Sequence, residues 1–217
     1  MQAKPVEGWT FTEEGHTFRD KNGSPVPSLT QILDSVGIVD YSSVPEGRLE
    51  YKRTVGDAVH YATKYRDLDT LDYSTVQPQW ANYLVAWEQF LEDTGFVPEE
   101  IEKPGVYSYS GMVYGCIIDR IGRFPGIKHR ALVELKCAYA EEPSWAIQLA
   151  GQELSIAKAE NEFIARIAVQ LKPDRTYKVF PDINGYQDPN DVKVFLWSLC
   201  VVQWKMKHGI SWRNGDV

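Results

Sequence analysis

The chain has 217 residues, of which 43% are hydrophobic and 24% charged, and its formal net charge is −7 at pH 7. This length and composition are typical of one compact globular domain with a sizeable core. The most apolar run, residues 194–202, is far shorter than the ~20 residues that a membrane span needs, and the N-terminus has no apolar segment typical of a secretory signal. We therefore expect a cytoplasmic protein with no membrane partner.

The three cysteines, Cys116, Cys137 and Cys200, are scattered along the chain. They form no CxxC pair and no cluster with histidine at the spacing of a zinc site. An iron–sulfur cluster usually needs four thiolates, so the sequence predicts no such cofactor. A dispersed, odd set of cysteines is typical of reduced thiols in the cytosol.

Basic residues concentrate in one segment although the chain as a whole is acidic. Between Arg48 and Arg66, five basic side chains stand against only two acidic ones. Charges are screened beyond ~8–10 Å at physiological salt, so a local basic strip can follow a phosphate backbone even on an acidic protein. The alternative is a solvated helix face, which the charge pattern alone favours. The strip consists of Arg48, Lys52, Arg53, Lys64 and Arg66.

The N-terminal part predicts a hairpin and a short helix over about residues 9–37. Two short runs between Trp9 and Val26 flank an Asn-Gly pair, which is a strong turn signal. Ser28 can cap the helix that comes next, and Gln31 three residues later can complete a capping box. Gly37 is expected to end that helix.

The rest of the chain alternates between helical and strand patterns. We expect helices over residues 46–66, 78–94, 144–159 and 188–209, and strands over residues 101–109, 112–121, 131–137, 163–171 and 177–180. This order predicts an α/β fold, with a central mixed β-sheet flanked by helices. No linker is long enough to divide it, so residues 1–217 are expected to form a single domain.

Acidic residues and a lysine fall together on the predicted strands. Glu134 and Lys136 lie two positions apart, so they share one face of their strand, while Val133 and Leu135 point into the core. Asp119 lies on the preceding strand and can reach the same place. A carboxylate pair beside a lysine is therefore expected on one face of the sheet.

This arrangement suits phosphodiester hydrolysis, which builds negative charge on the phosphoryl oxygens. Two carboxylates that hold Mg²⁺ counter this charge and activate a water molecule, and a neighbouring lysine stabilises it further. His60 and Gln148 can approach the site from helices. The alternative is that Glu134 and Lys136 form a surface ion pair worth ~0–1 kcal/mol, that His60 is structural and that Gln148 is an ordinary exposed residue.

Four segments, taken in order, resemble the PD-(D/E)XK nuclease superfamily in its branch of RecB-like and phage exonuclease-type domains. The ordered set is much more specific than any single motif, and with the leader hairpin and helix it spans roughly residues 23–205. The segments are Val55–His60, similar to a helix motif with a glycine and a metal-site histidine; Tyr114–Ile121, similar to the strand with the metal aspartate; Val133–Lys136, similar to the E-x-K strand; and Trp145–Gln152, similar to the Q-x-x-x-Y helix.

The resemblance implies a restriction-endonuclease-like core with a metal site. Asp119 and Glu134 would bind the metal together with the backbone carbonyl of Leu135. His60 would complete or support the site. Glu102 matches an acid often found one strand earlier in this family, which makes it a further supporting residue.

The resemblance also assigns residues to catalysis and to DNA. Lys136 would be the catalytic lysine, and Gln148 would orient it or contact the DNA. The sequence departs from the motif at Gln152, where tyrosine is expected; Gln152 still faces the same way as Gln148, one helical turn on, and is expected to contact DNA. The basic strip would hold the phosphate backbone.

The expected function is a Mg²⁺-dependent deoxyribonuclease in which Mn²⁺ can substitute. We expect an exonuclease of DNA recombination or repair, of phage origin, with DNA as its partner and a single-strand annealing or recombination protein as a second one. Both a monomer and a homo-oligomeric ring around DNA fit the sequence. Two alternatives remain open: a catalytically inactive nuclease-fold module that binds DNA or protein, and a structural protein whose acids form ion pairs.

Overall fold

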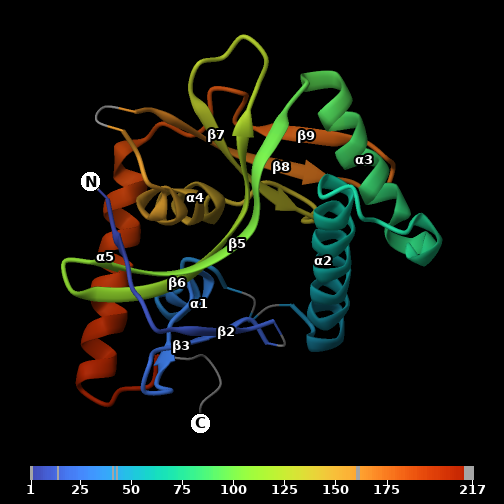
Figure 1. Cartoon of the computed structure of the whole chain (residues 1–217). Helices are drawn as coiled ribbons and strands as arrows, with labels where there is room; N and C mark the ends of the chain where they lie inside the picture. The colour runs from blue at the N-terminus through green and yellow to red at the C-terminus, as the bar shows by residue number, and fades with distance from the viewer. Residues whose placement is uncertain (1, 14, 41, 43, 160–161, 213–217) are drawn as a thin grey trace.

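The computed structural model describes residues 2–13, 15–40, 42, 44–159 and 162–212 (Figure 1). A six-stranded sheet in the order β1-β5-β6-β7-β8-β9 forms the centre. β7 and β8 run parallel, and the other neighbouring pairs run antiparallel. The strands are β1 (Lys4–Pro5), β5 (Val97–Tyr109), β6 (Met112–Arg123), β7 (Arg130–Lys136), β8 (Ile164–Leu171) and β9 (Tyr177–Phe180).

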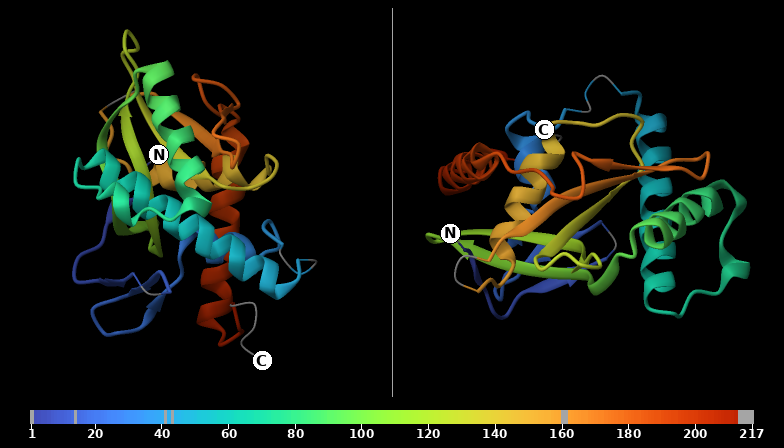
Figure 2. Two further views of the ribbon diagram at one scale, coloured as in Figure 1. Left: turned by 90° about the vertical axis from the view of Figure 1, so that its right-hand side faces the viewer. Right: turned by 90° about the horizontal axis from the view of Figure 1, so that it is seen from above.

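Helices cover both faces of this sheet, as the view from above in Figure 2 shows. On one face lie α2 (Glu46–Asp67) and α3 (Pro78–Thr94), with the short 3₁₀ helix η1 (Tyr73–Thr75) between them in the chain; on the other lie α1 (Leu29–Ser35), α4 (Ser144–Ser155) and α5 (Pro189–Lys207). The mixed sheet between helices confirms the predicted α/β fold class. Within the described ranges, no helix combines the length and the apolar character needed to cross a membrane.

The two cores arise from the alternation of side chains along the central strands. On β7, Leu132 packs with α4 and α5, whereas Val133 and Leu135 pack with α2 and α3. Glu134 and Lys136 lie two and four positions after Leu132, so they share its face of the sheet, on the side of α4. The predicted shared face of Glu134 and Lys136 is confirmed by their contact with each other.

The N-terminal segment forms a second sheet of three strands, β2 (Thr10–Thr12), β3 (Thr17–Arg19) and β4 (Pro25–Val26). The sequence predicted one hairpin here, but the chain turns twice. The additional turn contains Gly15 with φ +75° and precedes the Asn-Gly turn. Phe18 docks this sheet onto β6 at Gly115, where a Cβ atom would lie 2.5 Å from the Phe18 ring. Only glycine allows this approach, which brings the hairpin beside the central sheet.

Most predicted helix boundaries agree with the structure. The predicted capping box of α1 is present, because Ser28 accepts from the Gln31 amide and the Gln31 side chain accepts from the Ser28 amide. α4 ends at Ser155, four residues earlier than expected, because Ile156 turns into extended backbone and buries its side chain in the core. β5 begins at Val97, earlier than predicted, and continues past an irregularity between Pro98 and Glu100.

Candidate metal centre

The candidate site lies where β6 and β7 separate. Their ladder joins Arg120–Gly122 to Ala131–Val133, and the next residues along the two strands are Asp119 and Glu134. Instead of a further backbone pair, Asp119 Oδ2 accepts a hydrogen bond of 2.8 Å from the Leu135 amide. Asp119 and Glu134 are each only 5% exposed. The end of the ladder therefore places two buried acids side by side, as the sequence predicted.

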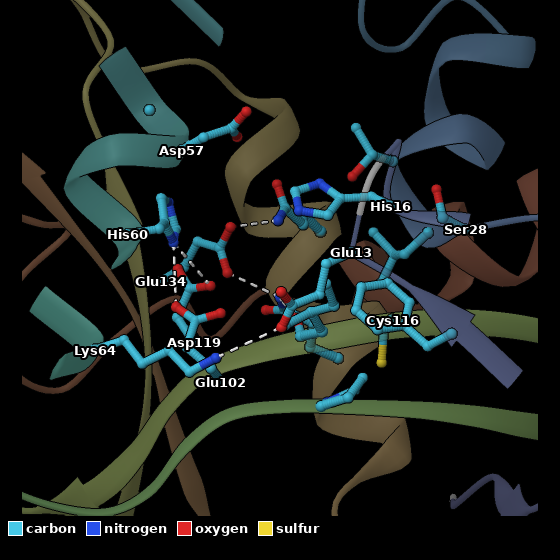
Figure 3. A pocket seen from close by; sticks show the side chains of 18 of the residues that line it. Glu13, His16, Ser28, Asp57, His60, Lys64, Glu102, Cys116, Asp119 and Glu134 are labelled. Atoms are coloured by element: carbon cyan, nitrogen blue, oxygen red, sulfur yellow. Dashed lines mark hydrogen bonds and ion pairs between the residues drawn. The ribbon is translucent and has the colours of Figure 1, made fainter. Parts of the chain in front are cut away.

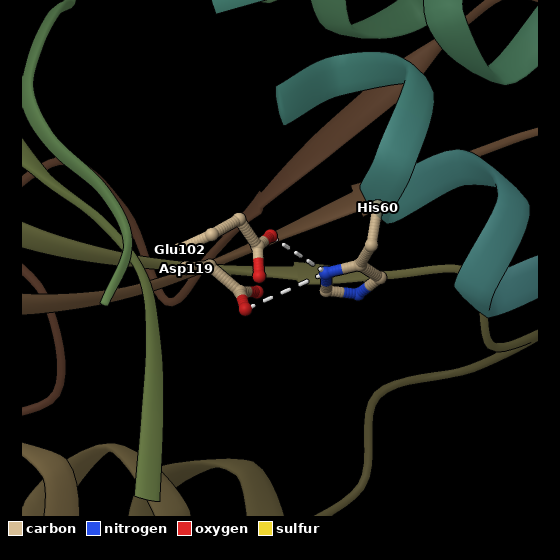
Figure 4. A group of neighbouring side chains, drawn as sticks. All are labelled: His60, Glu102 and Asp119. Atoms are coloured by element: carbon tan, nitrogen blue, oxygen red, sulfur yellow. Dashed lines mark hydrogen bonds and ion pairs between the residues drawn. The ribbon is translucent and has the colours of Figure 1, made fainter. Parts of the chain in front are cut away.

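His60 of α2 and Glu102 of β5 join Asp119 at this point (Figure 4). His60 Nδ1 lies 3.4 Å from Glu102 Oε1 and 3.5 Å from Asp119 Oδ1. One ligand atom from each of the three residues lies within 4.8 Å of the others. Glu102 therefore lies beside His60 and Asp119, the two residues that the resemblance places at the metal site.

Glu102 adopts an uncommon backbone conformation. Its φ of +46° falls in the left-handed region, which non-glycine residues rarely occupy and which is often found at functional sites. The flanking pairs Ile101 with Arg120 and Lys103 with Ile118 keep the strands in register around it. The surrounding ladder thus holds Glu102 in this strained conformation beside Asp119.

The electrostatics of the cluster show an excess of negative charge. Burial and the nearby charge of Glu134 raise the pKa of Asp119 to about 8. Burial lowers the pKa of His60, but Asp119 and Glu102 outweigh it, and the net pKa is raised to about 9. Burial raises the pKa of Glu102, but His60 and Arg120 outweigh it and lower the net pKa. The cluster therefore retains protons in the absence of another cation.

These donors fit a divalent metal ion. Two carboxylates and an imidazole come together, and the Glu134 carboxylate lies near enough to raise the pKa of Asp119 by its charge. Mg²⁺ and Mn²⁺ prefer carboxylate and carbonyl oxygens as ligands, and transition-metal ions also bind imidazole nitrogen. In a β-strand, the N–H and C=O groups of one residue point toward the same edge of the strand. The Leu135 amide donates to Asp119, so the Leu135 carbonyl also lies on the edge of β7 that faces Asp119.

Glu134 belongs to a second polar group on the α4 face. Lys136 Nζ donates to Glu134 Oε1 at 3.0 Å and to Gln148 Oε1 at 2.8 Å. Gln148 donates to the same Glu134 oxygen, and Gln152 Nε2 donates to Glu134 Oε2 at 2.8 Å. Lys136 is therefore held beside the acidic cluster by Glu134 and Gln148, from β7 and α4.

The position of Gln152 differs from the predicted DNA contact. Gln152 is only 2% exposed, and its amide nitrogen donates to the Ile117 carbonyl as well as to Glu134. Its amide oxygen has no hydrogen-bond partner within the described part of the chain. Gln152 thus holds Glu134 in place from inside the protein, because α4 packs this face of the helix against β6 and β7.

Sequence reasoning missed Arg120, the fully buried residue next to Asp119. Its guanidinium donates to Asp67 at 2.6 Å, to Glu102 at 3.2 Å and to Thr63 at 3.2 Å, and it also donates to the Asp119 carbonyl at 2.7 Å. Arg120 therefore connects α2 to the two acids of the cluster. A charged residue within an otherwise apolar strand pattern was the available signal, because buried charges need partners.

The basic strip of α2 is divided by the structure. Arg53 and Lys64 line the cleft at the acidic cluster, and Arg48 and Lys52 are exposed on the same helix. Arg66 does not line the cleft, because its guanidinium lies 3.7 Å from Glu88 and 3.5 Å from Asp67. Three members of the strip are therefore exposed, and Lys64 lines the cleft 3.9 Å from Glu13, whereas Arg66 lies between two acids.

The cleft has a volume of about 460 Å³ and opens beside the acidic residues (Figure 3). His60, Glu102, Asp119 and Glu134 line it. The size falls within the ~300–1,000 Å³ typical of ligand sites. The acidic residues and His60 are thus accessible from a pocket rather than sealed in the core.

Comparison of the chain with protein-family models and with curated protein sequences found no match.

Proposed function

We propose that the protein is a metal-dependent DNA nuclease of the PD-(D/E)XK type, with Mg²⁺ or Mn²⁺ as its cofactor. The observation that carries this proposal is the meeting of Asp119, Glu102 and His60 within 4.8 Å of one another, at the place where Lys136 is held by Glu134. A cleft gives access to His60, Glu102, Asp119 and Glu134. The residue types suit hydrolysis of a phosphodiester.

Each residue has a distinct task in this proposal. Asp119, Glu102 and His60 would hold the metal, with Glu134 and the Leu135 carbonyl beside them. A bound divalent ion supplies Lewis acidity toward a phosphoryl oxygen and lowers the pKa of a bound water. Lys136 places a positive charge where negative charge develops in the transition state, and removing such a group typically costs ~10²–10³ in turnover.

Gln148 and Gln152 of α4 act as positioning residues. Both donate to Glu134, and Gln148 also accepts from Lys136. Their fixed side chains reduce the reorganisation that the site needs during the reaction. Gln148 remains at the cleft, where it can also meet the substrate.

The structural alternative is disfavoured by burial. The alternative requires Glu134 and Lys136 to form an ordinary solvent-exposed ion pair, but the Glu134 side chain is 6% exposed and the Lys136 side chain 18%. Grouping buried carboxylates weakens a fold, since each charge loses water and repels its neighbours. Such an arrangement is typical of functional sites, where it is retained for chemistry.

Exonuclease activity in recombination or repair and phage origin remain part of the proposal through the resemblance of the sequence alone. So do a recombination partner and a ring-shaped oligomer. The rival within the same fold is an inactive module that binds DNA or protein. Activity and metal binding distinguish this rival from an enzyme.

The direct test is digestion of end-labelled linear DNA and closed circular DNA in Mg²⁺, in Mn²⁺ and in EDTA. We expect cleavage of linear DNA that requires metal and that disappears in Asp119→Asn. Glu99→Gln is the matched control, because Glu99 is an exposed acid that pairs with Arg123. Metal-dependent cleavage of unchanged rate in Asp119→Asn would contradict the site assignment. Cleavage of closed circles would contradict an exonuclease.

A further inference from the structure

The cleft beside the acidic cluster has two walls, and both carry aromatic rings. The β2–β3 hairpin contributes Phe11 and His16, and α2 contributes Tyr61 together with Arg53 and Lys64. Figure 3 shows His16 and Lys64 near the same opening as Asp119 and Glu134. The two walls bear on the form of nucleic acid that the cleft accepts, an inference that rests on the proposed nuclease function.

The hairpin wall is held by packing. The Phe11 ring lies 4.9 Å from the ring of buried Phe18, which fixes it on the central sheet. The Phe11 and His16 rings are nearly parallel, with planes 16° apart and centroids 6.1 Å apart. His16 is exposed and Phe11 is half-buried. The wall therefore offers ordered aromatic surface at the cleft.

The helix wall combines an aromatic ring with positive charge. Tyr61 is 38% exposed, and Lys64 Nζ lies 6.0 Å from the centre of its ring. Arg53 is exposed and has no ion pair with any residue that the structure describes. Lys64 lies 3.9 Å from Glu13 across the opening. Glu13 is largely exposed, so this pair is weak and a phosphate can displace it.

We propose that this cleft binds single-stranded DNA, with an unpaired base stacked on the Phe11 and His16 surface and phosphates held by Arg53 and Lys64. Within a duplex, every base except those of the terminal pairs is covered on both faces by its neighbours, so a base inside a strand can offer a face to an aromatic side chain only when it is unpaired. Aromatic rings next to cations are the arrangement that binds single strands without sequence preference. The rings share a cleft with the metal cluster, so the stacked base belongs near the cleaved phosphate.

The test measures binding of a short labelled single strand and of the matching blunt duplex by fluorescence anisotropy, in Ca²⁺ to suppress cleavage. We expect the single strand to bind more tightly than the duplex. The double variant Phe11→Leu, His16→Asn should weaken single-strand binding by about five-fold to a hundred-fold, as expected for the loss of a base–aromatic stack. Duplex binding should change less than two-fold.

Two further variants support the interpretation. Phe163→Leu is the matched control, because Phe163 also contacts a histidine ring, His129 at 4.9 Å, but lies outside the cleft. His16→Asn alone changes an exposed side chain, so it tests the wall even if the double variant fails to fold. Thermal unfolding identifies such a failure.

Each outcome decides a separate question. The inference is overturned if the duplex binds as tightly as the single strand. It is also overturned if the single-strand affinity is unchanged in His16→Asn and, where that variant folds, in the double variant. A ribonucleotide strand that binds more tightly than the DNA strand overturns the assignment to DNA. If the Phe11 and His16 variants weaken binding but the protein cleaves no DNA in Mg²⁺ or Mn²⁺, the single-strand inference stands and the nuclease proposal is refuted. If the protein cleaves DNA but these variants bind as tightly as wild type, the nuclease proposal stands and the single-strand inference is refuted.

Discussion

Asp119 is a buried acid whose charge is disfavoured by the folded protein without metal. Burial and Glu134 raise its pKa to about 8, above the ~3.9 of an unfolded aspartate. A raised pKa of this kind contributes stability at low pH, and that contribution is lost as the pH rises toward 8. The residue thus reduces the stability of the fold at neutral pH, and in the proposed function it is a metal ligand.

We predict that Asp119→Asn raises the melting temperature in EDTA. Asparagine keeps an oxygen for the Leu135 amide and removes the repulsion from Glu134, and each ~1 kcal/mol gained corresponds to about 2–4 °C for a protein of this size. The advantage over wild type should grow as the pH rises from about 4 to about 8. Differential scanning calorimetry across this range measures it; a variant less stable than wild type at pH 8 would argue against a destabilising carboxylate.

Glu134 lies between Lys136 and the proposed metal ligand Asp119. We predict that Lys136→Met reduces cleavage by ~10²–10³ and leaves Mn²⁺ affinity within a few-fold of wild type, because Lys136 contacts Glu134 and Gln148. Calorimetric titration of Mn²⁺ and single-turnover cleavage provide the two measurements. Lys136→Arg keeps the charge and serves as the control. Loss of metal affinity in a folded Lys136→Met would mean that the two roles are not separate.

Helix α2 brings several features of the proposed site to one place. His60 reaches the acids, and Arg53, Gly56, Asp57 and Lys64 line the cleft at helical spacing from it. A Cβ at Gly56 would meet no atom within 4 Å, so this glycine leaves open space on the helix at the cleft. A single helix therefore carries both the imidazole of the proposed metal site and the positive charge of the cleft wall.

The divided basic strip leads to a prediction about salt. Replacing Arg48, Arg53 and Lys64 by alanine should flatten the dependence of log K on log salt by roughly two to three units on duplex DNA, and by about two on single strands, if each contacts one phosphate. Arg66→Ala is the control, since Glu88 and Asp67 already engage Arg66. Binding titrations in Ca²⁺ at several salt concentrations decide it. An unchanged slope in the triple variant would assign the strip to solvent.

Across the whole molecule, the site joins the two layers of helices through the sheet. His60 comes from α2 on one face and Gln148 from α4 on the other, and both reach carboxylates at the end of the β6–β7 ladder. Arg120 fastens α2 and β5 to β6 by ion pairs with Asp67 and Glu102. A cation bound here would bridge elements that otherwise meet through repelling acids.

We therefore predict that Mn²⁺ stabilises the entire fold. A ligand at a hundred times its Kd adds about 2.7 kcal/mol, which corresponds to a rise of about 5–10 °C in melting temperature. Thermal unfolding in Mn²⁺ and in EDTA measures the difference. Glu99→Gln should retain the shift and Asp119→Asn should lose most of it. An equal shift in wild type and Asp119→Asn would place the bound ion elsewhere.

Features that depend on local periodicity could be predicted from the order of the amino acids. Alternation along a strand put Glu134 and Lys136 on one face, and helical spacing put Gln148 and Gln152 one turn apart on one face of α4. The capping box at Ser28 and the order of helices and strands follow from the same local rules. These features depend only on residues close together in the sequence, so they can be predicted without knowledge of the tertiary structure.

Contacts between distant segments of the chain could be seen only in the folded protein. Glu102 reaches Asp119 through a positive φ held by the β5–β6 register, and Arg120 meets Asp67 across fifty-three residues of chain. Gln152 faces Glu134 instead of solvent because of the way α4 packs on the sheet. Local sequence patterns say which face a side chain occupies, but the partner on that face is set by long-range packing. Long-range packing also places the β2–β3 hairpin, with Phe11 and His16, beside the acidic cluster, because Phe18 docks at Gly115.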